Sequence, residues 1–350
     1  MNDEEKIKMF YDVFAPKAGE KVLFLVDLPH DHIRDNEKWI DRRKMAEEWY
    51  KTFQEMGKET GFTVDLMEYK ATGLNNAPVP EDVLDAVRNS NLVLAMTEFS
   101  GTSSILPICR SQDSTTRGAS MPRVERRMEN SAFKANYKDV KRYAQAISKL
   151  LNKAIGAEVL FSTGDTLFID LRNRTGHADT GDCTEYGMGI NFPSGEACTT
   201  AYEATPDEIE EFGESKTKGI WPAEYDGEIV KYIVENNRIE DVIGEGKQAD
   251  KKRAFFEEND TRRNLAELGI GCNPEAVVTG NVLEDEKVGG LHIAYGMSAH
   301  LGGKVKSDVH QDICYPKDAP IQAKTLTLIN EDGSKTEIIK EARLQYELFS

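Results

Sequence analysis

The 350-residue sequence lacks the long apolar runs and the cysteine pairs typical of membrane and disulfide-bonded proteins. No stretch of about 18 apolar residues occurs, so no segment is predicted to cross a bilayer as a helix. The first ten residues, MNDEEKIKMF, have neither the basic start nor the apolar centre of a signal peptide. The five cysteines are scattered and form no CxxC pair, which predicts reduced thiols. We therefore expect a cytoplasmic protein.

Basic side chains are also scarce, with 44 Lys and Arg against 61 Asp and Glu, and the formal net charge is −17. A nucleic-acid binder needs a basic footprint for phosphates, and an anionic membrane attracts basic segments. The charge balance therefore argues against both classes of partner. Residues 201–260 alone hold 17 acidic and 8 basic side chains. This segment suggests an electronegative approach that attracts cations and protonated amines, and the alternative is a solvated acidic surface.

The first 155 residues instead contain alternating strand and helix patterns. Short apolar runs at 21–28 and 91–97 are typical of strands that are buried on both faces, and 62–69 predicts a further strand. Helical apolar spacing is present over 39–57, 82–87 and, as a long amphipathic stripe, 137–155. This alternation predicts an α/β domain with a parallel sheet and right-handed crossovers.

After residue 156 the sequence changes to short strand patterns and glycine-rich turns. Hairpins are predicted at 158–172 and 325–339, and one helix at 247–259. We therefore predict an α/β N-terminal domain (1–155) plus a strand-rich α+β C-terminal domain (156–350). The second is expected to be the metal-binding, catalytic domain, because the candidate ligands described next lie within it.

Three of the six histidines fall within residues 292–310. In an extended segment, residues two apart point to the same face, so His310 and Asp312 are expected to converge. His292 begins a second strand-like run, HIAYG, and an antiparallel pairing would bring it beside His310. Two histidines and one carboxylate fit a mononuclear iron site or a zinc site. The alternative is a core histidine with satisfied hydrogen bonds, or a surface salt bridge.

Two glutamates stand in apolar surroundings, Glu196 in a turn before a strand and Glu267 in the run LAELGIG. A lone buried carboxylate is costly, so such residues are paired or bind metal, unless they lie on an exposed strand face. With the two histidines and the aspartate they supply enough ligands for two divalent ions, which carboxylates bridge at about 3.5–4 Å. Gly269 and Gly271 form no dinucleotide-binding motif, and they predict turns or close backbone approaches.

These segments occur in a characteristic order along the chain: PSGE at 193–196, AELGIG at 266–271, HIAYG at 292–296 and SDVHQD at 307–312. With these motifs in this order, the sequence resembles the aminopeptidase T/aminopeptidase S family of metallo-aminopeptidases. The members are leucyl aminopeptidase-like and are also called thermophilic metallo-aminopeptidases. The resemblance covers roughly residues 157–320. It implies a dinuclear centre of zinc, cobalt, manganese or magnesium, held by Glu196, Glu267, His292, His310 and Asp312.

The resemblance also implies an activity, that of a hydrolase and metalloprotease acting on a peptide or small amide, and a homodimer. Glu196 or Glu267 would pass a proton from water to the leaving amine, in addition to binding metal. The family places a tyrosine seven residues after its first metal histidine, and here this position is Ala299. The neighbouring His300 is the candidate to hydrogen-bond a developing oxyanion, whereas Tyr295 is expected to face elsewhere.

A sister group of the same fold, the 2,5-dihydroxypyridine dioxygenases, provides the alternative. Its members hold one ferrous iron with two histidines and an aspartate, and this chain would use His292, His310 and Asp312. That group has histidine at the position of Glu267 and no glutamate at the position of Glu196. Two extra carboxylates favour two divalent ions over one, so we rank the hydrolase first. A non-catalytic metal-binding protein is the third possibility.

Overall fold

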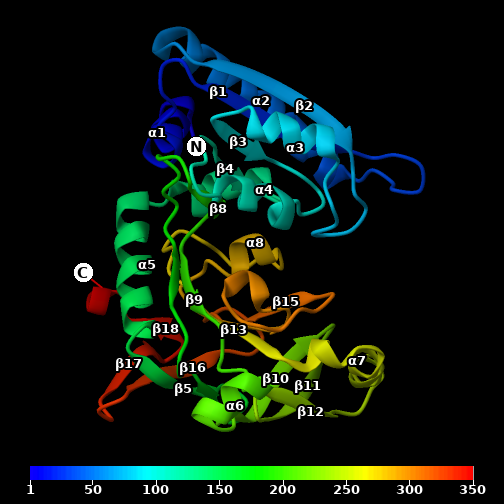
Figure 1. The fold of residues 1–350 in the computed structure, drawn as a ribbon, viewed down its shortest axis with the longest axis vertical. Coiled ribbons are helices and arrows are strands. Elements are labelled where there is room, and N and C mark those ends of the chain that lie inside the picture. Colours follow the sequence, from blue (N-terminus) through cyan, green and yellow to red (C-terminus); the bar gives the residue numbers. More distant parts are fainter. Residues whose placement is uncertain (350) are drawn as a thin grey trace. The chain divides into compact units, whose positions relative to one another are not determined.

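The computed structural model describes residues 1–349, and the chain forms two compact units (Figure 1). The first unit contains Met1–Lys141, Asp179–Ser194 and Glu275–Val277. The second contains Arg142–Ala178, Gly195–Pro274 and the chain from Val278 onward. The division between residues 155 and 156 stays a prediction for the separately folding domains. Within the described residues, no helix combines the length and the apolar character needed to cross a membrane.

The first unit is built on a parallel sheet in the order β2-β1-β3-β4-β8. Its strands are β1 (Lys21–Leu28), β2 (Thr63–Lys70), β3 (Leu92–Ala95), β4 (Arg117–Ser120) and β8 (Gly189–Asn191). All of its pairings are parallel, which confirms the predicted α/β architecture. β8 comes from a later part of the chain than the other four strands and pairs with β4.

Helices cover both faces of this sheet: α1 (Asp3–Phe14), α2 (Glu37–Thr60), α3 (Glu81–Arg88) and α4 (Thr102–Cys109). On one face, Phe53 of α2 packs against Phe24 of β1 with ring centroids 5.3 Å apart. On the other, Val83 of α3 and Ile105 of α4 are buried in a cluster with Leu25 and other strand residues. The alternating side chains of a parallel strand thus reach a separate helical layer on each side.

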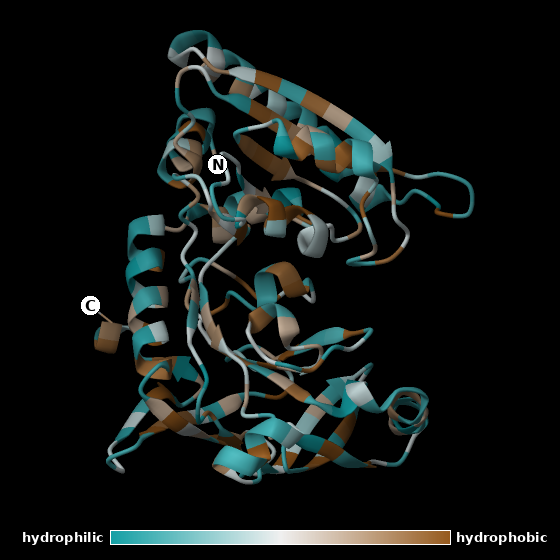
Figure 2. Cartoon of the chain, in the orientation of Figure 1, coloured by the Kyte–Doolittle hydropathy of each residue, from teal (hydrophilic) through white to brown (hydrophobic). Residues whose placement is uncertain are grey.

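The second unit contains two antiparallel sheets. The larger has the order β12-β11-β10-β6-β5-β16-β17-β18. Its strands are β5 (Ala154–Phe161), β6 (Thr166–Asp170), β10 (Lys218–Tyr225), β11 (Glu228–Glu235), β12 (Arg238–Ile243), β16 (Ala323–Asn330), β17 (Lys335–Lys340) and β18 (Arg343–Leu344). Burial alternates along β11, where Val230, Tyr232 and Val234 are buried and the residues between them are partly exposed, as expected of a strand with one face in the core. Figure 2 shows hydrophilic and hydrophobic residues mixed along the strands of this sheet.

The smaller sheet has the order β15-β14-β13-β9-β7. Its strands are β7 (His177–Asp179), β9 (Glu196–Thr199), β13 (Leu265–Gly271), β14 (Gly290–Gly296) and β15 (His310–Cys314). The remaining helical elements are α5 (Tyr137–Leu151), α6 (Pro206–Phe212), α7 (Lys247–Glu258), α8 (Val282–Asp285), η1 (Arg126–Asn130), η2 (Ala132–Lys134), η3 (Asp260–Arg263), η4 (Ala299–Leu301) and η5 (Tyr346–Phe349). Both predicted hairpins and the predicted helix at 247–259 are confirmed.

One predicted boundary is wrong. The amphipathic pattern over 137–155 predicted a helix as far as residue 155, but α5 ends at Leu151 and Ala154 already begins β5. Ala154 and Ile155 continue the helical stripe, but pairing of β5 with β6 and β16 decides their conformation. Tertiary pairing therefore overrides the local helical pattern at this junction.

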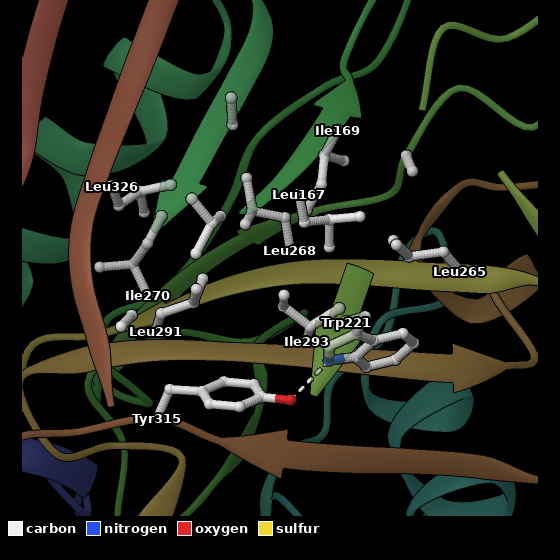
Figure 3. Packing of buried hydrophobic residues seen from close by; sticks show 14 of the residues in the cluster. Leu167, Ile169, Trp221, Leu265, Leu268, Ile270, Leu291, Ile293, Tyr315 and Leu326 are labelled. Atoms are coloured by element: carbon white, nitrogen blue, oxygen red, sulfur yellow. Dashed lines mark hydrogen bonds between the residues drawn. The ribbon is translucent and has the colours of Figure 1, made fainter. Parts of the chain in front are cut away.

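The core of the second unit lies between its two sheets (Figure 3). Leu268 and Ile270 of β13 and Ile293 of β14 point into it from the smaller sheet. Trp221 donates a hydrogen bond from its indole nitrogen to the Tyr315 hydroxyl at 2.5 Å, so a polar pair inside the core is satisfied. This packing fixes one face of β13 and β14 and leaves the opposite face to carry other side chains.

Candidate metal centre

The candidate ligands lie on the face of the smaller sheet that points away from this core. Directly paired residues of antiparallel strands stand side by side on one face. His292 of β14 pairs with Gly269 of β13. Two residues further along β14, Ala294 pairs with Glu267 on one side and with Asp312 on the other. Glycine and alanine therefore leave space between the imidazole and the two carboxylates.

The outer strands bring in the other two candidate ligands. Glu196 is the first residue of β9 and pairs with Gly271. His310 is the first residue of β15, two positions before Asp312, so both side chains are on one face as the spacing predicted. The antiparallel pairing of β14 with β15 was also predicted and is present. All five candidate ligands thus come together from four neighbouring strands.

One group of possible ligands contains Glu196, Glu267 and His292, with ligand atoms within 4.8 Å of one another. The Nε2 atom of His292 lies 3.3 Å from Oε2 of Glu196 and 3.4 Å from Oε1 of Glu267. The three side chains are only 2 to 12% exposed. Two carboxylates and one imidazole, buried together, make a donor set suited to a divalent ion.

A second group contains Glu267, His310 and Asp312, so Glu267 belongs to both. The Nε2 atom of His310 lies 3.0 Å from Oε2 of Glu267 and 3.6 Å from Oδ1 of Asp312. Each oxygen of Glu267 therefore faces a different histidine. A carboxylate with this orientation is suited to bridging two ions.

The hydrogen bond made by His310 fits a bound cation. Nδ1 of His310 lies 2.7 Å from the carbonyl oxygen of Met297, and because a carbonyl only accepts, Nδ1 must donate. The lone pair of neutral His310 is then on Nε2 and faces carboxylate oxygens. Such a second hydrogen bond is the usual way in which proteins orient a metal-binding histidine. Within residues 1–349, Nδ1 of His292 has no hydrogen-bond partner although it is buried.

The pKa values of the two histidines and of Glu267 are shifted because these groups are buried next to one another. Burial alone lowers the pKa of His292, but hydrogen bonds to Glu196 and Glu267 raise it well above the usual 6.5. Burial likewise lowers the pKa of His310, and its acidic neighbours raise it well above 6.5. Burial raises the pKa of Glu267, but its hydrogen bonds to both histidines hold it well below 4.5. The carboxylates therefore require positive charge among them, whether it comes from protons or from metal ions.

Gly269 makes room for this arrangement. A Cβ atom at this position would stand 1.9 Å from Nε2 of His292 and 2.3 Å from Cε1. Any side chain there would displace the imidazole. The sequence left open whether this glycine marks a turn or a close approach, and the structure shows a close approach inside β13.

Two charged residues beside the ligands were not identified from the sequence. Lys287 is completely buried, and its Nζ atom lies 2.5 Å from Oε1 of Glu196 and 2.8 Å from Oε1 of Glu286. Burial, together with Glu196 and Asp312, raises the pKa of Glu286 to about 8, although Lys287 opposes the shift. The only local signal was a run of four charged residues, EDEK at 284–287, and such runs are usually solvated.

His300 also lies next to the cluster, on η4. Its ring meets that of His310 edge to face, with centroids 4.6 Å apart and planes at 88°. His300 is exposed, unlike the candidate ligands, and its neighbour Ala299 carries no polar side chain. Tyr295 faces the opposite way, as expected, because it is buried in the core and its hydroxyl contacts Lys252 and Gln311.

The loop that carries His300 is held by polar contacts. Glu203 accepts hydrogen bonds from the Ser298 hydroxyl and, at 2.7 Å, from the backbone N–H of Lys304. Nε2 of His177 donates to the carbonyl oxygen of Leu301 at 3.0 Å. The five cysteines are all free thiols in the part of the chain that the structure describes, as predicted.

Comparison with known proteins supports the fold. No protein-family model matches the chain, and no curated protein matches its sequence. Its structure is similar to that of 2,5-dihydroxypyridine dioxygenase from Pseudomonas putida KT2440, with a TM-score of 0.68, 17% identity and 98% of each chain covered. It is also similar to AmpT from Thermus thermophilus, an aminopeptidase T, with a TM-score of 0.60, 14% identity, and 98% of this chain and 99% of that chain covered. The chain thus has a fold that these two enzymes share.

Proposed function

We propose that the chain is a metal-dependent hydrolase, similar to aminopeptidases that remove N-terminal residues from peptides at a dinuclear metal centre. The observation that supports this most strongly is the presence of two ligand groups that share Glu267. Glu196 and His292 would complete one subsite, and His310 and Asp312 the other. The similarity to the Thermus thermophilus aminopeptidase, over nearly the whole of both chains, agrees with this proposal.

The chemistry is divided between the ions and the chain. Bound divalent ions would activate a water molecule and polarise a scissile carbonyl. Glu196 or Glu267 would accept the proton of that water at a carboxylate oxygen and pass it to the leaving amine. His300, exposed and in contact with the His310 ring, would donate a hydrogen bond to the developing oxyanion.

The proposed substrate is a peptide or a small amide with a free amino terminus. A protonated amine is attracted to an acidic surface, and residues 201–260 supply 17 acidic side chains against 8 basic ones. The same negative charge disfavours nucleic acid as a partner. A homodimer is proposed on the family resemblance.

A ferrous-iron ring-cleaving dioxygenase is the second candidate. The higher of the two TM-scores, 0.68, belongs to the Pseudomonas putida dioxygenase. In this case His292, His310 and Asp312 would hold a single iron, and Glu196 would take no part. We rank it second because Glu196 and Glu267 both reach His292, which gives the cluster more carboxylate ligands than one iron requires. A metal-binding protein without catalytic activity is the third possibility.

The test is a comparison of two reactions on one preparation. The protein is loaded with zinc, manganese, cobalt or ferrous iron and assayed with a panel of aminoacyl amides and, separately, with 2,5-dihydroxypyridine under oxygen. The proposal expects amide hydrolysis that a chelator abolishes. Oxygen uptake with the dihydroxylated ring and no amide hydrolysis would replace the hydrolase with the dioxygenase. A metal-loaded protein inactive in both assays would point to metal binding alone.

Replacing Glu267 by alanine is the corresponding mutational test. Because Glu267 belongs to both ligand groups, E267A is expected to abolish metal-dependent hydrolysis and to leave the far-UV circular dichroism spectrum unchanged. E158A serves as the control, because Glu158 is a half-exposed carboxylate of β5 that pairs with Lys335. Full activity in E267A would refute the role assigned to this residue.

A further inference from the structure

A buried ammonium group touches one of the two proposed metal subsites. Lys287 lies between α8 and β14, and its side chain is 0% exposed. Its Nζ atom contacts Oε1 of Glu196 at 2.5 Å and Oε1 of Glu286 at 2.8 Å. A buried ammonium is strongly destabilising unless it is paired, so its contacts with Glu196 and Glu286 fix its position.

Glu196 therefore faces both the Lys287 ammonium and the His292 imidazole. Its Oε1 atom is bonded to Lys287, and its Oε2 atom lies 3.3 Å from Nε2 of His292. A divalent ion held by Glu196 and His292 would share the carboxylate with a unit positive charge that is already in place. Like charges that are close together in a buried environment repel strongly, because water does not screen them.

The subsite formed with His310 has a different arrangement. The group that orients His310 is neutral: Nδ1 donates to the backbone carbonyl oxygen of Met297 at 2.7 Å. Its carboxylates, Glu267 and Asp312, face Nε2 of His310 at 3.0 and 3.6 Å. Electrostatics therefore favours an ion here over one at Glu196.

We propose that Lys287 makes the two metal subsites unequal. The subsite of His310 and Asp312 fills first and tightly, and the subsite of Glu196 and His292 takes its ion weakly and exchangeably. This inference rests on the proposed metal-dependent function and adds an order of loading to it. It makes Lys287 a positioning residue that acts through Glu196.

The experiment is a titration of the full-length apoprotein with Mn²⁺, followed by electron paramagnetic resonance of the free ion and by metal analysis after gel filtration. Wild-type protein is expected to retain one ion per chain and to bind a second at least about tenfold more weakly. K287M removes the charge and keeps an unbranched side chain that is only one heavy atom shorter. The second ion should then bind about tenfold or more tightly than in wild type, which brings the two affinities together.

Two further variants keep the test decisive if K287M does not fold. K287R retains the positive charge and should keep the wild-type order of loading. E196Q should lose the weak ion and keep the tight one. K252M is the matched control, because Lys252 is a partly buried lysine of the same unit whose nitrogen bonds to the Tyr295 hydroxyl at 2.9 Å, on the other side of the sheet.

The outcomes separate this inference from the proposed function. Two ions bound with equal affinity by wild type, or a tight ion lost in E196Q, would overturn the role of Lys287 and leave a metal-dependent enzyme in place. A wild-type protein that retains no ion at any concentration tested would instead overturn the proposed metal centre. Unequal binding that K287M removes and K252M preserves would support the inference.

Discussion

Gly269 offers a sharp test of the metal centre, because a single methyl group should remove one ligand. In G269A the new Cβ would stand 1.9 Å from Nε2 of His292, whereas ordinary van der Waals contact begins at 3.4 Å. The imidazole must therefore move by about 1.5 Å, and metal–ligand distances tolerate about 0.2 Å. We expect the affinity for the ion at Glu196 and His292 to fall at least about tenfold.

The same substitution should also lower stability. Insertion of a methyl group into a filled space costs about 1–3 kcal/mol, and each kcal/mol lowers the melting temperature by about 2–4 °C in a domain of this size. G156A is the matched control, because a Cβ at Gly156 would stand 2.6 Å from the Phe168 ring in the larger sheet. It should destabilise the fold without changing metal affinity.

Metal affinity is measured by calorimetric titration of both variants, and melting temperature by differential scanning calorimetry of the apoproteins. We expect G269A alone to lose affinity for the metal ion. If G269A binds both ions as wild type does, His292 is not a ligand. If G156A loses affinity to the same extent, general destabilisation explains the effect and the local argument fails.

Two further predictions concern pH and the core. The pKa of His292 is raised, so its ion pairs stabilise the apoprotein below about pH 6.5, and this stabilisation is lost as the pH rises through the folded-state pKa. The pKa of Glu267 is depressed, so the stabilisation that its carboxylate contributes is lost as the pH falls below about 4.5. Zinc should therefore raise the melting temperature more at about pH 8 than at about pH 6, and an equal increase would contradict the proton–metal competition. Y315F leaves the Trp221 indole N–H and the Pro222 carbonyl without this partner and should cost about 1–3 kcal/mol of unfolding free energy in urea titrations. No change in the midpoint would show that water replaces the hydroxyl.

The sequence predicted the candidate site better than it predicted the chain's long-range pairings. The spacing of His310 and Asp312 and the strand pattern at His292 carry their own geometry, because alternation along a strand assigns each residue to a face. β8 was not foreseen, since the three residues Gly189–Asn191 have no strand signal of their own and pair in parallel with β4. α4 was also missed, because Pro107 lies inside it and proline ordinarily ends a helical pattern.

Lys287 shows why the rest of the site could not be predicted. A lysine in a run of charged residues is normally solvated, and nothing in the local sequence indicates burial. Its place is decided by the turn between α8 and β14, which brings it to Glu196, 91 residues earlier in the chain. The need for glycine at position 269 was likewise not predictable from the local sequence, because the His292 ring that occupies the space beside it belongs to the neighbouring strand β14.

The central claim is that a metal ion binds where β9, β13, β14 and β15 meet. X-ray diffraction from zinc-soaked crystals, recorded on both sides of the zinc absorption edge, tests it directly. The account predicts an anomalous peak at about 2.0–2.2 Å from a Glu267 oxygen, with Nε2 of His310 as a further ligand. Saturating zinc with no anomalous peak among these side chains would contradict it.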